Sequence, residues 1–356
     1  MGVISGIYLQ TLTARPDIQV AGIADLDMGR ASTAASGIPG ARALEVPALL
    51  ADPDIDVVLN LTIPAAHAEI ALAAIANGKH VYGEKPLAVD LDSGRQVMDA
   101  ASAAGVRLGS APDTVIGTGT QTARAVIDEG RIGRPIAATA MMATPGPESW
   151  HPNPDFYFLP GGGPLMDMGP YYISALVHLL GPVTAVVGSA SRLRSERVIG
   201  SGPRAGVRIP VEVDTHVSGI LEHASGALST LTTSFDSVKS SAAPIEIHGE
   251  TGSLSIPDPN MFSGDVSFCA LGSTEWEPIG LRAGYVDAAR GIGLLDMLAA
   301  RSEADVRASG RLALHTLEVM TAVLASARTG ARVTLETTVE RPPLVPLGRE
   351  FDLRRV

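Results

Sequence analysis

The first residues that could bind a ligand lie at the amino terminus. Gly2-Val3-Ile4-Ser5 leads directly into a helical pattern, and Asp25 follows Gly2 by 23 residues at the end of an apolar run. In dinucleotide-binding domains, the glycines of G-x-G-x-x-G and a helix N-terminus hold the pyrophosphate, and a carboxylate about 20 residues later meets the ribose hydroxyls. The spacing therefore predicts that Gly2, Val3, Ile4 and Asp25 bind a dinucleotide.

This interpretation makes Gly2 the second glycine of the motif and puts Ser5 in the place of the third. The strand and the glycine that should come first are then absent from the sequence. The alternative is that Met1 starts a surface helix and that Asp25 is an ordinary strand-end residue. Because the first strand is central in the usual strand order, its loss would strip both neighbours of backbone partners. We therefore expect the native chain to extend upstream, which an intact mass of the native protein would test.

The elements that would position these residues follow a regular rhythm in the first third of the chain. Strand patterns cover 18–24, 57–61, 80–82 and 106–108, and helical patterns over 67–77 and 92–104 each end at a glycine. Near-continuous apolar strands between amphipathic helices indicate a parallel sheet covered on both faces. We predict a doubly wound, Rossmann-type α/β domain over residues 1–113.

The alternation of strand and helix patterns gives way to consecutive strand patterns after residue 113. Helical patterns cover 120–129 and 312–327, and strand patterns cover 136–142, 184–191, 211–222, 226–235 and 245–256. Consecutive strands joined by tight turns, such as Gly249-Glu250-Thr251-Gly252, are typical of antiparallel pairing. We predict a second α/β domain with a large open, mainly antiparallel sheet over residues 114–340, followed by a Pro-rich tail over 341–356.

Composition excludes several classes of function. The formal net charge of −11 argues against nucleic acid as a partner, since phosphate backbones require basic surfaces. No apolar run approaches the roughly 20 residues of a membrane helix, and the amino terminus has no signal-peptide pattern. The single Cys269 cannot form an internal disulfide, and no Cys/His cluster has zinc spacing. We expect a metal-free enzyme in the cytoplasm.

Two motifs resemble one known family. The first runs from Thr62 to His67 and continues as Gly78-Lys79-His80-Val81-Tyr82-Gly83-Glu84-Lys85-Pro86-Leu87-Ala88; the second is Gly161-Gly162-Gly163-Pro164-Leu165-Met166-Asp167-Met168-Gly169-Pro170-Tyr171. Both resemble the glucose–fructose oxidoreductase / inositol dehydrogenase (Gfo/Idh/MocA) family. The resemblance implies a Rossmann domain, an α/β domain whose open sheet often joins dimers or tetramers, and hydride transfer between nicotinamide and a secondary alcohol of a sugar or polyol.

The resemblance also implies roles for particular residues. Lys85 is expected beside the nicotinamide and the reacting hydroxyl, with a cis bond before Pro86. Other residues of the first motif are expected around the cofactor, namely Thr62, Pro64, His67 and Glu84. A carboxylate at Asp25 would repel a 2′-phosphate and so favours NAD, although Arg30 lies close enough in sequence to leave NADP open.

The second motif departs from the family pattern. Family dehydrogenases commonly carry D-x-x-x-H with histidine as the proton-transfer residue, whereas this chain has Asp167 and Tyr171. Positions i and i+4 of a helix share a face, so both side chains can reach one substrate. The reference pKa of tyrosine is near 10, and a nearby Lys85 ammonium would lower it. Tyr171 is therefore expected to relay the proton; the alternative is that it packs or binds a sugar hydroxyl.

A Pro-rich loop before the three glycines holds the candidate substrate contacts. Aromatic rings stack on the apolar faces of sugars, and histidine reads hydroxyls, so we predict substrate contacts for Trp150, His151 and Tyr157, with Tyr285 as a further candidate. Two other functions stay open. One is an NAD-dependent glycoside hydrolase of the same family, and the other is a non-catalytic protein that senses a sugar or a dinucleotide.

Overall fold

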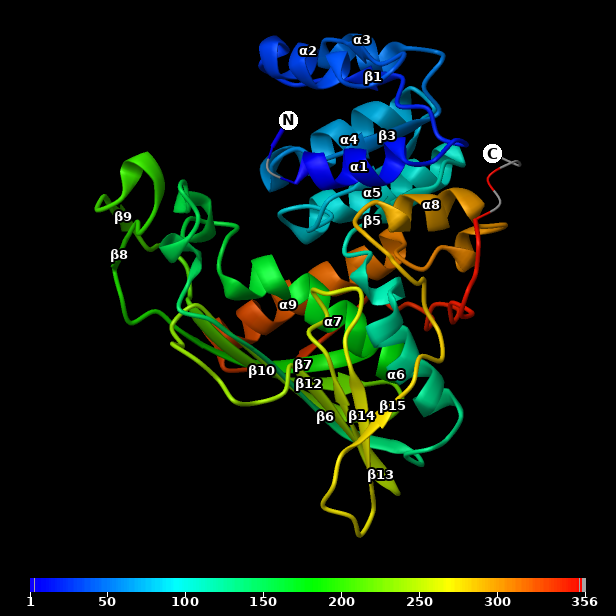
Figure 1. Cartoon of the computed structure of the whole chain (residues 1–356). Coiled ribbons are helices and arrows are strands. Elements are labelled where there is room, and N and C mark those ends of the chain that lie inside the picture. Colours follow the sequence, from blue (N-terminus) through cyan, green and yellow to red (C-terminus); the bar gives the residue numbers. More distant parts are fainter. Residues whose placement is uncertain (3, 352, 354–356) are drawn as a thin grey trace. The chain divides into compact units, whose positions relative to one another are not determined.

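The computed structural model describes residues 1–2, 4–351 and 353, which form two compact units (Figure 1). Unit 1 contains Met1–Ile116, Asp287–Leu314 and Arg349–Val356, and unit 2 contains Gly117–Val286 and His315–Gly348. The sequence placed a boundary near residue 113, but it assigned residues 287–314 to the second domain and the end of the chain to a separate tail. Residues 287–314 belong to unit 1, whereas the predicted tail over 341–356 is divided, with residues up to Gly348 in unit 2 and those from Arg349 on in unit 1.

Unit 1 is built from parallel strands and helices, as the sequence predicted. Its strands form two parallel sheets: β1 (Gly22–Ile23) with β2 (Arg42–Ala43), and β3 (Val57–Asn60), β4 (His80–Gly83) and β5 (Leu108–Ser110) in that order. The helices that alternate with these strands are α1 (Ser5–Thr13), α2 (Met28–Ser36), α3 (Val46–Ala51), α4 (His67–Ala76) and α5 (Leu91–Ala104). Two of these helices begin at a carboxylate cap: Asp27 accepts the Gly29 amide at the start of α2, and Asp90 accepts the Ser93 amide at the start of α5.

The two sheets of unit 1 share no strand pair within the described residues. Helix α1 buries Tyr8 and Leu12 in a core that also takes in Val57 and Leu59 of β3. The strand expected upstream of α1 stays a prediction. Val3, one of the predicted cofactor contacts, lies outside the described residues.

Helix α8 (Ile292–Ala299) explains why residues 287–314 belong to unit 1. Nearly every side chain of α8 is buried, and Leu294, Leu295 and Met297 pack with Tyr8 and Tyr82 in one core. Tight packing requires a glycine at position 293, because a Cβ there would lie 2.1 Å from the Tyr82 hydroxyl oxygen. The apolar surface of α8 thus completes the core of the parallel-sheet unit.

Unit 2 is dominated by a nine-stranded mixed sheet with the order β15-β14-β13-β12-β6-β11-β10-β7-β16. Only the β6–β11 pair is parallel among the described strands of this sheet, which agrees with the mainly antiparallel prediction. The strands are β6 (Pro135–Ala143), β7 (Val183–Ser191), β10 (His216–His223), β11 (Leu228–Ser234), β12 (Ile245–Gly249), β13 (Gly252–Ile256), β14 (Val266–Ala270), β15 (Glu277–Ile279) and β16 (Val333–Thr334).

Helices cover one face of this sheet (Figure 1). They are α6 (Thr118–Asp128), α7 (Pro164–Leu180) and α9 (Gly310–Thr329), the last belonging to unit 2 from His315 on. A Cβ at Gly169 of α7 would lie 2.9 Å from the sulfur of Met320 of α9, so the two helices pack closely at that point. The covered face of β6 buries Ala138, Ala140 and Met142.

Shorter elements complete the chain. A hairpin of β8 (Glu196–Val198) and β9 (Arg208–Pro210) had no signal in the sequence pattern. The 3₁₀ turns are η1 (Pro64–Ala66), η2 (Thr114–Ile116), η3 (Pro147–Ser149), η4 (Asp155–Tyr157), η5 (Gly202–Arg204) and η6 (Glu303–Asp305). Of the helices that the structure describes, none combines the length and the apolar character needed to cross a membrane.

Candidate active site

The turn that carries Lys85 follows directly from β4. The peptide bond between Lys85 and Pro86 is cis, as the family resemblance implied. The Glu84 carboxylate holds the turn from two sides: its Oε2 accepts the Lys85 amide at 3.0 Å, and its Oε1 accepts the Tyr8 hydroxyl at 2.7 Å. Lys85 itself is partly exposed. One carboxylate thus links the backbone of Lys85 to helix α1.

Tyr8 is suited to act as the donor in this link. Its side chain is fully buried, and burial together with the nearby Glu84 charge raises the pKa of its phenol well above the ordinary value. The phenol therefore keeps its proton and donates a hydrogen bond to the carboxylate. The sequence analysis did not predict this contact.

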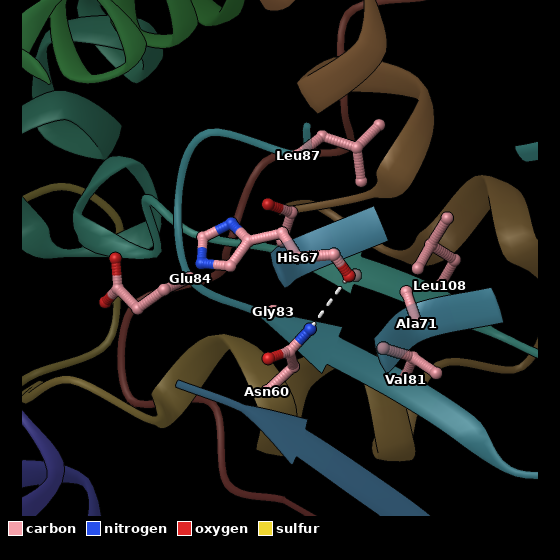
Figure 2. A pocket seen from close by; sticks show the side chains of 10 residues that line it. Asn60, His67, Ala71, Val81, Gly83, Glu84, Leu87 and Leu108 are labelled. Atoms are coloured by element: carbon pink, nitrogen blue, oxygen red, sulfur yellow. Dashed lines mark hydrogen bonds between the residues drawn. The ribbon is translucent and has the colours of Figure 1, made fainter. Parts of the chain in front are cut away.

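Residues of the first motif gather where β3 and β4 end (Figure 2). His67 is the first residue of α4, and its ring nitrogens lie 2.6 Å from the Pro86 carbonyl oxygen and 3.0 Å from the Thr62 carbonyl oxygen. Asn60, the last residue of β3, donates to the His67 carbonyl at 3.0 Å and accepts the Thr62 hydroxyl at 2.7 Å. The predicted residues Thr62, His67, Glu84 and Lys85 are therefore brought together, and Pro64 lies in η1 between the first two.

Asp25 lies just beyond β1 and close to the amino terminus. Its carboxylate forms an ion pair with the Met1 ammonium and accepts the Asp27 amide at 2.8 Å. Gly2 lies in the same short segment, where its carbonyl accepts the Ser5 hydroxyl at 2.7 Å, and Ile4 immediately precedes α1. Arg30 pairs with Asp27 at 3.4 Å. The predicted residues Gly2, Ile4 and Asp25 thus form a second group in unit 1.

Asp113 has a structural role that the sequence did not reveal. It follows β5, where ligands of open sheets gather, yet its side chain is fully buried. Its Oδ2 accepts the amides of Gly291 and Gly293 at 2.8 and 3.2 Å, at the start of α8. Burial raises the pKa of the Asp113 carboxyl to about 6. This residue fastens α8 to the parallel-sheet unit.

In unit 2, the second motif forms the first turns of α7. Gly161 and Gly163 have φ values of 90° and 94°, which favour glycine, and a Cβ at Gly162 would lie 2.4 Å from the Phe156 carbonyl oxygen. Asp167 lies in the first turn of α7 and is partly exposed, whereas Tyr171 is 5 % exposed. Their spacing places them on one helix face, as predicted.

Four rings form an aromatic cluster before α7, namely Trp150, His151, Phe156 and Tyr157. The centroid of the His151 ring lies 5.4 Å from Trp150, 5.5 Å from Phe156 and 5.6 Å from Tyr157. Trp150 is 63 % exposed and Phe156 is 50 % exposed. Three of these residues were predicted as substrate contacts. Phe156 was missed, although it lies between two predicted residues in sequence.

A buried arginine supports the loop of the aromatic cluster. Arg197 of β8 donates to the carboxylates of Glu148 and Asp236 at 2.7 and 2.5 Å, and its guanidinium lies 5.4 Å from the centroid of the Phe158 ring. Arg204 holds Asp155 through two hydrogen bonds of 2.6 and 2.8 Å. Because a buried guanidinium with two carboxylates fixes geometry, the β8–β9 hairpin anchors the loop.

Tyr285, the remaining predicted substrate contact, is 3 % exposed and pairs through its backbone with Gly117. It belongs to unit 2 together with Asp167, Tyr171 and the aromatic cluster, whereas Asp25, His67 and Lys85 belong to unit 1. No cluster of three or more His, Cys, Asp or Glu side chains that could hold a metal ion occurs in residues 1–2, 4–351 and 353.

Comparisons with known proteins agree with this architecture. The chain is 34 % identical to a 1,5-anhydro-D-fructose reductase from Ensifer adhaerens over 234 residues, which is 64 % of each chain and so less than two thirds of that relative. An NAD-binding oxidoreductase structure from Klebsiella pneumoniae has a TM-score of 0.79 at 23 % identity and covers 94 % of this chain and 95 % of its own. A levoglucosan dehydrogenase structure in complex with NADH has a TM-score of 0.77 at 21 % identity, and the match covers 95 % of this chain and 98 % of that chain.

Two family models match consecutive parts of the chain. Residues 1–111 match the oxidoreductase family with an NAD-binding Rossmann fold, and residues 120–255 match the GFO/IDH/MocA C-terminal domain. The predicted fold class is therefore confirmed, with a Rossmann domain followed by an α/β domain with a large sheet. The order of the two models and their joint span leave one assignment: the chain belongs to the Gfo/Idh/MocA family of oxidoreductases.

Proposed function

We propose that this chain is an NAD-dependent dehydrogenase that moves a hydride between nicotinamide and a secondary alcohol carbon of a sugar, polyol or related compound. The observation that carries the proposal is the Lys85 turn at the end of β4, in which Glu84 accepts the Lys85 amide and His67 contacts the Pro86 carbonyl. The turn belongs to a domain matched by an NAD-binding model, and the relatives described above act on sugars by name.

The residues of unit 1 fit a dinucleotide. Asp25 offers a carboxylate at the end of β1 that would accept hydrogen bonds from a ribose diol. Thr62 is exposed just beyond β3, and within the described residues no heavy atom beyond the chain neighbours of Gly2 lies within 4 Å of a Cβ built on that glycine, which leaves room for close approach of a phosphate. The Asp25 charge would repel a 2′-phosphate, so we propose NAD as the cofactor; NADP is the alternative because Arg30 lies nearby in sequence.

The chain's own residues would manage the proton and the charge. Bound nicotinamide supplies the acceptor or donor of the hydride. The Lys85 ammonium would donate a hydrogen bond to the reacting oxygen of the substrate. It would stabilise the negative charge that develops on that oxygen as the substrate hydroxyl loses its proton. We assign the proton relay to the phenol of Tyr171 and the orientation of substrate hydroxyls to Asp167. The aromatic cluster, through Trp150, His151 and Tyr157, would stack on a sugar ring, and Tyr285 is a further candidate contact.

A substrate screen tests the proposed function. The protein is incubated with a panel of sugars, polyols and their phosphates, each with NAD and with NADP, and the absorbance of reduced nicotinamide is followed. A steady increase with at least one compound is expected. Cleavage of a glycoside without net reduction of the cofactor would instead identify a hydrolase, and binding without turnover would identify a sensor.

We also propose that copies of the chain associate through the open face of the nine-stranded sheet. Val187 and Ile220, paired across β7 and β10, are 38 % and 44 % exposed on that face. Exposed apolar side chains on a broad sheet are typical of interfaces. Sedimentation of the wild type and of Ile220→Lys tests this, since the substitution should yield monomers.

A further inference from the structure

His67 has an unusual set of partners for a buried histidine. The residue is 3 % exposed, and both ring nitrogens meet backbone carbonyl oxygens: Nδ1 lies 2.6 Å from that of Pro86, and Nε2 lies 3.0 Å from that of Thr62. A carbonyl oxygen only accepts hydrogen bonds. Each ring nitrogen must therefore carry a proton if both contacts are hydrogen bonds.

A neutral imidazole has one N–H and one bare nitrogen. In the geometry around His67, a neutral ring would place a nitrogen lone pair against a carbonyl lone pair at one of the two contacts. This arrangement loses a hydrogen bond in a buried setting, where an unmade bond costs most. The imidazolium form donates at both ends and leaves neither carbonyl unpaired.

We propose that His67 is held as an imidazolium that ties the Thr62 segment to the Lys85–Pro86 turn and acts as a positioning residue for Lys85. The positioning role rests on the proposed function; the charge state of His67 does not. The two tied segments follow β3 and β4, and they contain the predicted contacts to cofactor and substrate. A doubly donating ring would fix the spacing between these segments through two charge-assisted hydrogen bonds.

The surroundings of the ring supply a counter-charge. Besides His67, the one titratable side chain that lines this pocket within the described residues is Glu84, at the end of β4. Its carboxylate oxygens accept the Tyr8 hydroxyl and the Lys85 amide, and a carboxylate charge near the ring favours the cationic form of the imidazole. The other side chains of the pocket are neutral, namely Asn60, Ala71, Val81, Leu87, Leu108 and Ser110 (Figure 2).

Nitrogen-15 NMR of the full chain, labelled at histidine, tests the charge state directly. His80 provides an internal reference, because its Nδ1 accepts the Arg107 amide at 3.0 Å and partial burial lowers its pKa. At neutral pH, His67 should show a directly bonded proton on both ring nitrogens, whereas His80 should show one bare nitrogen. A His67→Gln sample assigns the signals. One protonated and one bare nitrogen at His67 would overturn the proposal.

Kinetics of His67→Gln test the positioning role. Glutamine carries both of its N–H donors on one nitrogen, so it cannot reach the two carbonyls from two separate ring positions as imidazolium does. We therefore expect kcat to fall about tenfold to a hundredfold while KM for the sugar changes less than twofold. His80→Gln serves as the matched control and should retain kcat. An unchanged kcat in His67→Gln would refute positioning. A wild type that reduces no cofactor would refute the proposed function instead, and the NMR result would still decide the charge state.

Discussion

Replacing Tyr8 by Phe isolates the hydrogen bond that connects helix α1 to the Lys85 turn. Tyr8 and Tyr82 are both 0 % exposed and belong to the same core, so the two substitutions remove the same atom from the same surroundings. They differ in one respect. The Tyr8 hydroxyl donates to Glu84 at 2.7 Å, whereas the Tyr82 hydroxyl has no hydrogen-bond partner in the described part of the chain.

The magnitudes follow from this difference. A hydrogen bond to a charged group contributes about 1.5–3 kcal/mol, and Tyr8→Phe also leaves Glu84 Oε1 without its buried donor. Tyr82→Phe removes a hydroxyl that already pays desolvation without a bond, so we expect a change within about 0.5 kcal/mol or a slight gain. The free energy of the local opening that exposes the β4 amides to solvent should therefore fall by about 2 kcal/mol more in Tyr8→Phe than in Tyr82→Phe. This difference corresponds to about 30-fold in the equilibrium constant for that opening.

Hydrogen exchange of the β4 peptide, measured by mass spectrometry, reports this quantity. Tryptophan fluorescence would not, because both tryptophans, Trp150 and Trp276, lie in unit 2. The β4 amides should exchange faster in Tyr8→Phe and at an almost unchanged rate in Tyr82→Phe. Equal protection in the two variants would refute the reasoning that Glu84 is held by Tyr8.

Three further substitutions test other parts of the site and the fold. Asp25→Ser should weaken NAD binding about tenfold and improve NADP binding, because it removes both the acceptor for the ribose diol and the charge that repels a 2′-phosphate; titration calorimetry with both cofactors measures this, and an unchanged NAD affinity would contradict the assignment. Tyr171→Phe should lower kcat by about 10²–10⁴-fold if the phenol relays the proton; a rise in KM with kcat retained would mean that it only binds a sugar hydroxyl. Burial lowers the pKa of His315 to about 4, below the unfolded value of 6.5, so the unfolded chain gains a proton first as the pH falls. Unit 2 should therefore lose up to about 3 kcal/mol between pH 6.5 and 4 in urea unfolding followed by tryptophan fluorescence, and His315→Gln should flatten that dependence; parallel curves would contradict it.

Periodicity in the sequence predicted most of the alternating strands and helices of unit 1, but not α2, β2 and α3. The predicted helix over 67–77 corresponds to α4 (His67–Ala76), and the predicted strand over 80–82 corresponds to β4 (His80–Gly83). These two elements carry strong local signals, because Gly78 follows closely after α4 and β4 contains the apolar pair Val81-Tyr82. The first strand was predicted over 18–24 but is only Gly22–Ile23, since backbone pairing rather than apolar character decides where a strand begins.

The assignment of residues 287–314 could not be predicted from local pattern. Helix α8 (Ile292–Ala299) is apolar on nearly all sides, so it lacks the two-faced periodicity by which a surface helix is recognised. Its partners in unit 1 lie far away in sequence, and Asp113, which caps its start, bonds to Gly291 across 178 positions. From sequence alone, Asp113 at a strand end is a reasonable ligand candidate. The structure shows that its carboxylate instead accepts the amides of Gly291 and Gly293.

The candidate site likewise contains residues that the sequence identified and contacts that it could not. Motif resemblance identified Lys85, Glu84 and His67, and the structure places them around one turn, where Glu84 accepts the Lys85 amide and His67 contacts the Pro86 carbonyl. The hydrogen bond from Tyr8 to Glu84, which supports the turn, could not be predicted from the sequence. The two residues are 76 positions apart, and Tyr8 occupies an apolar helix face. Sequence spacing reports neighbours on one element, whereas this support is a contact between elements.

The central claim is that Lys85 acts on the reacting hydroxyl while the cofactor is held by other residues. A single-turnover experiment tests it most directly: the protein with bound NAD is mixed with a substrate from the screen, and the appearance of reduced nicotinamide is timed for the wild type and for Lys85→Met. We predict that Lys85→Met is slower by about 10²–10⁴-fold, with NAD affinity within a few-fold of wild type. A Lys85→Met rate equal to that of the wild type would contradict the account.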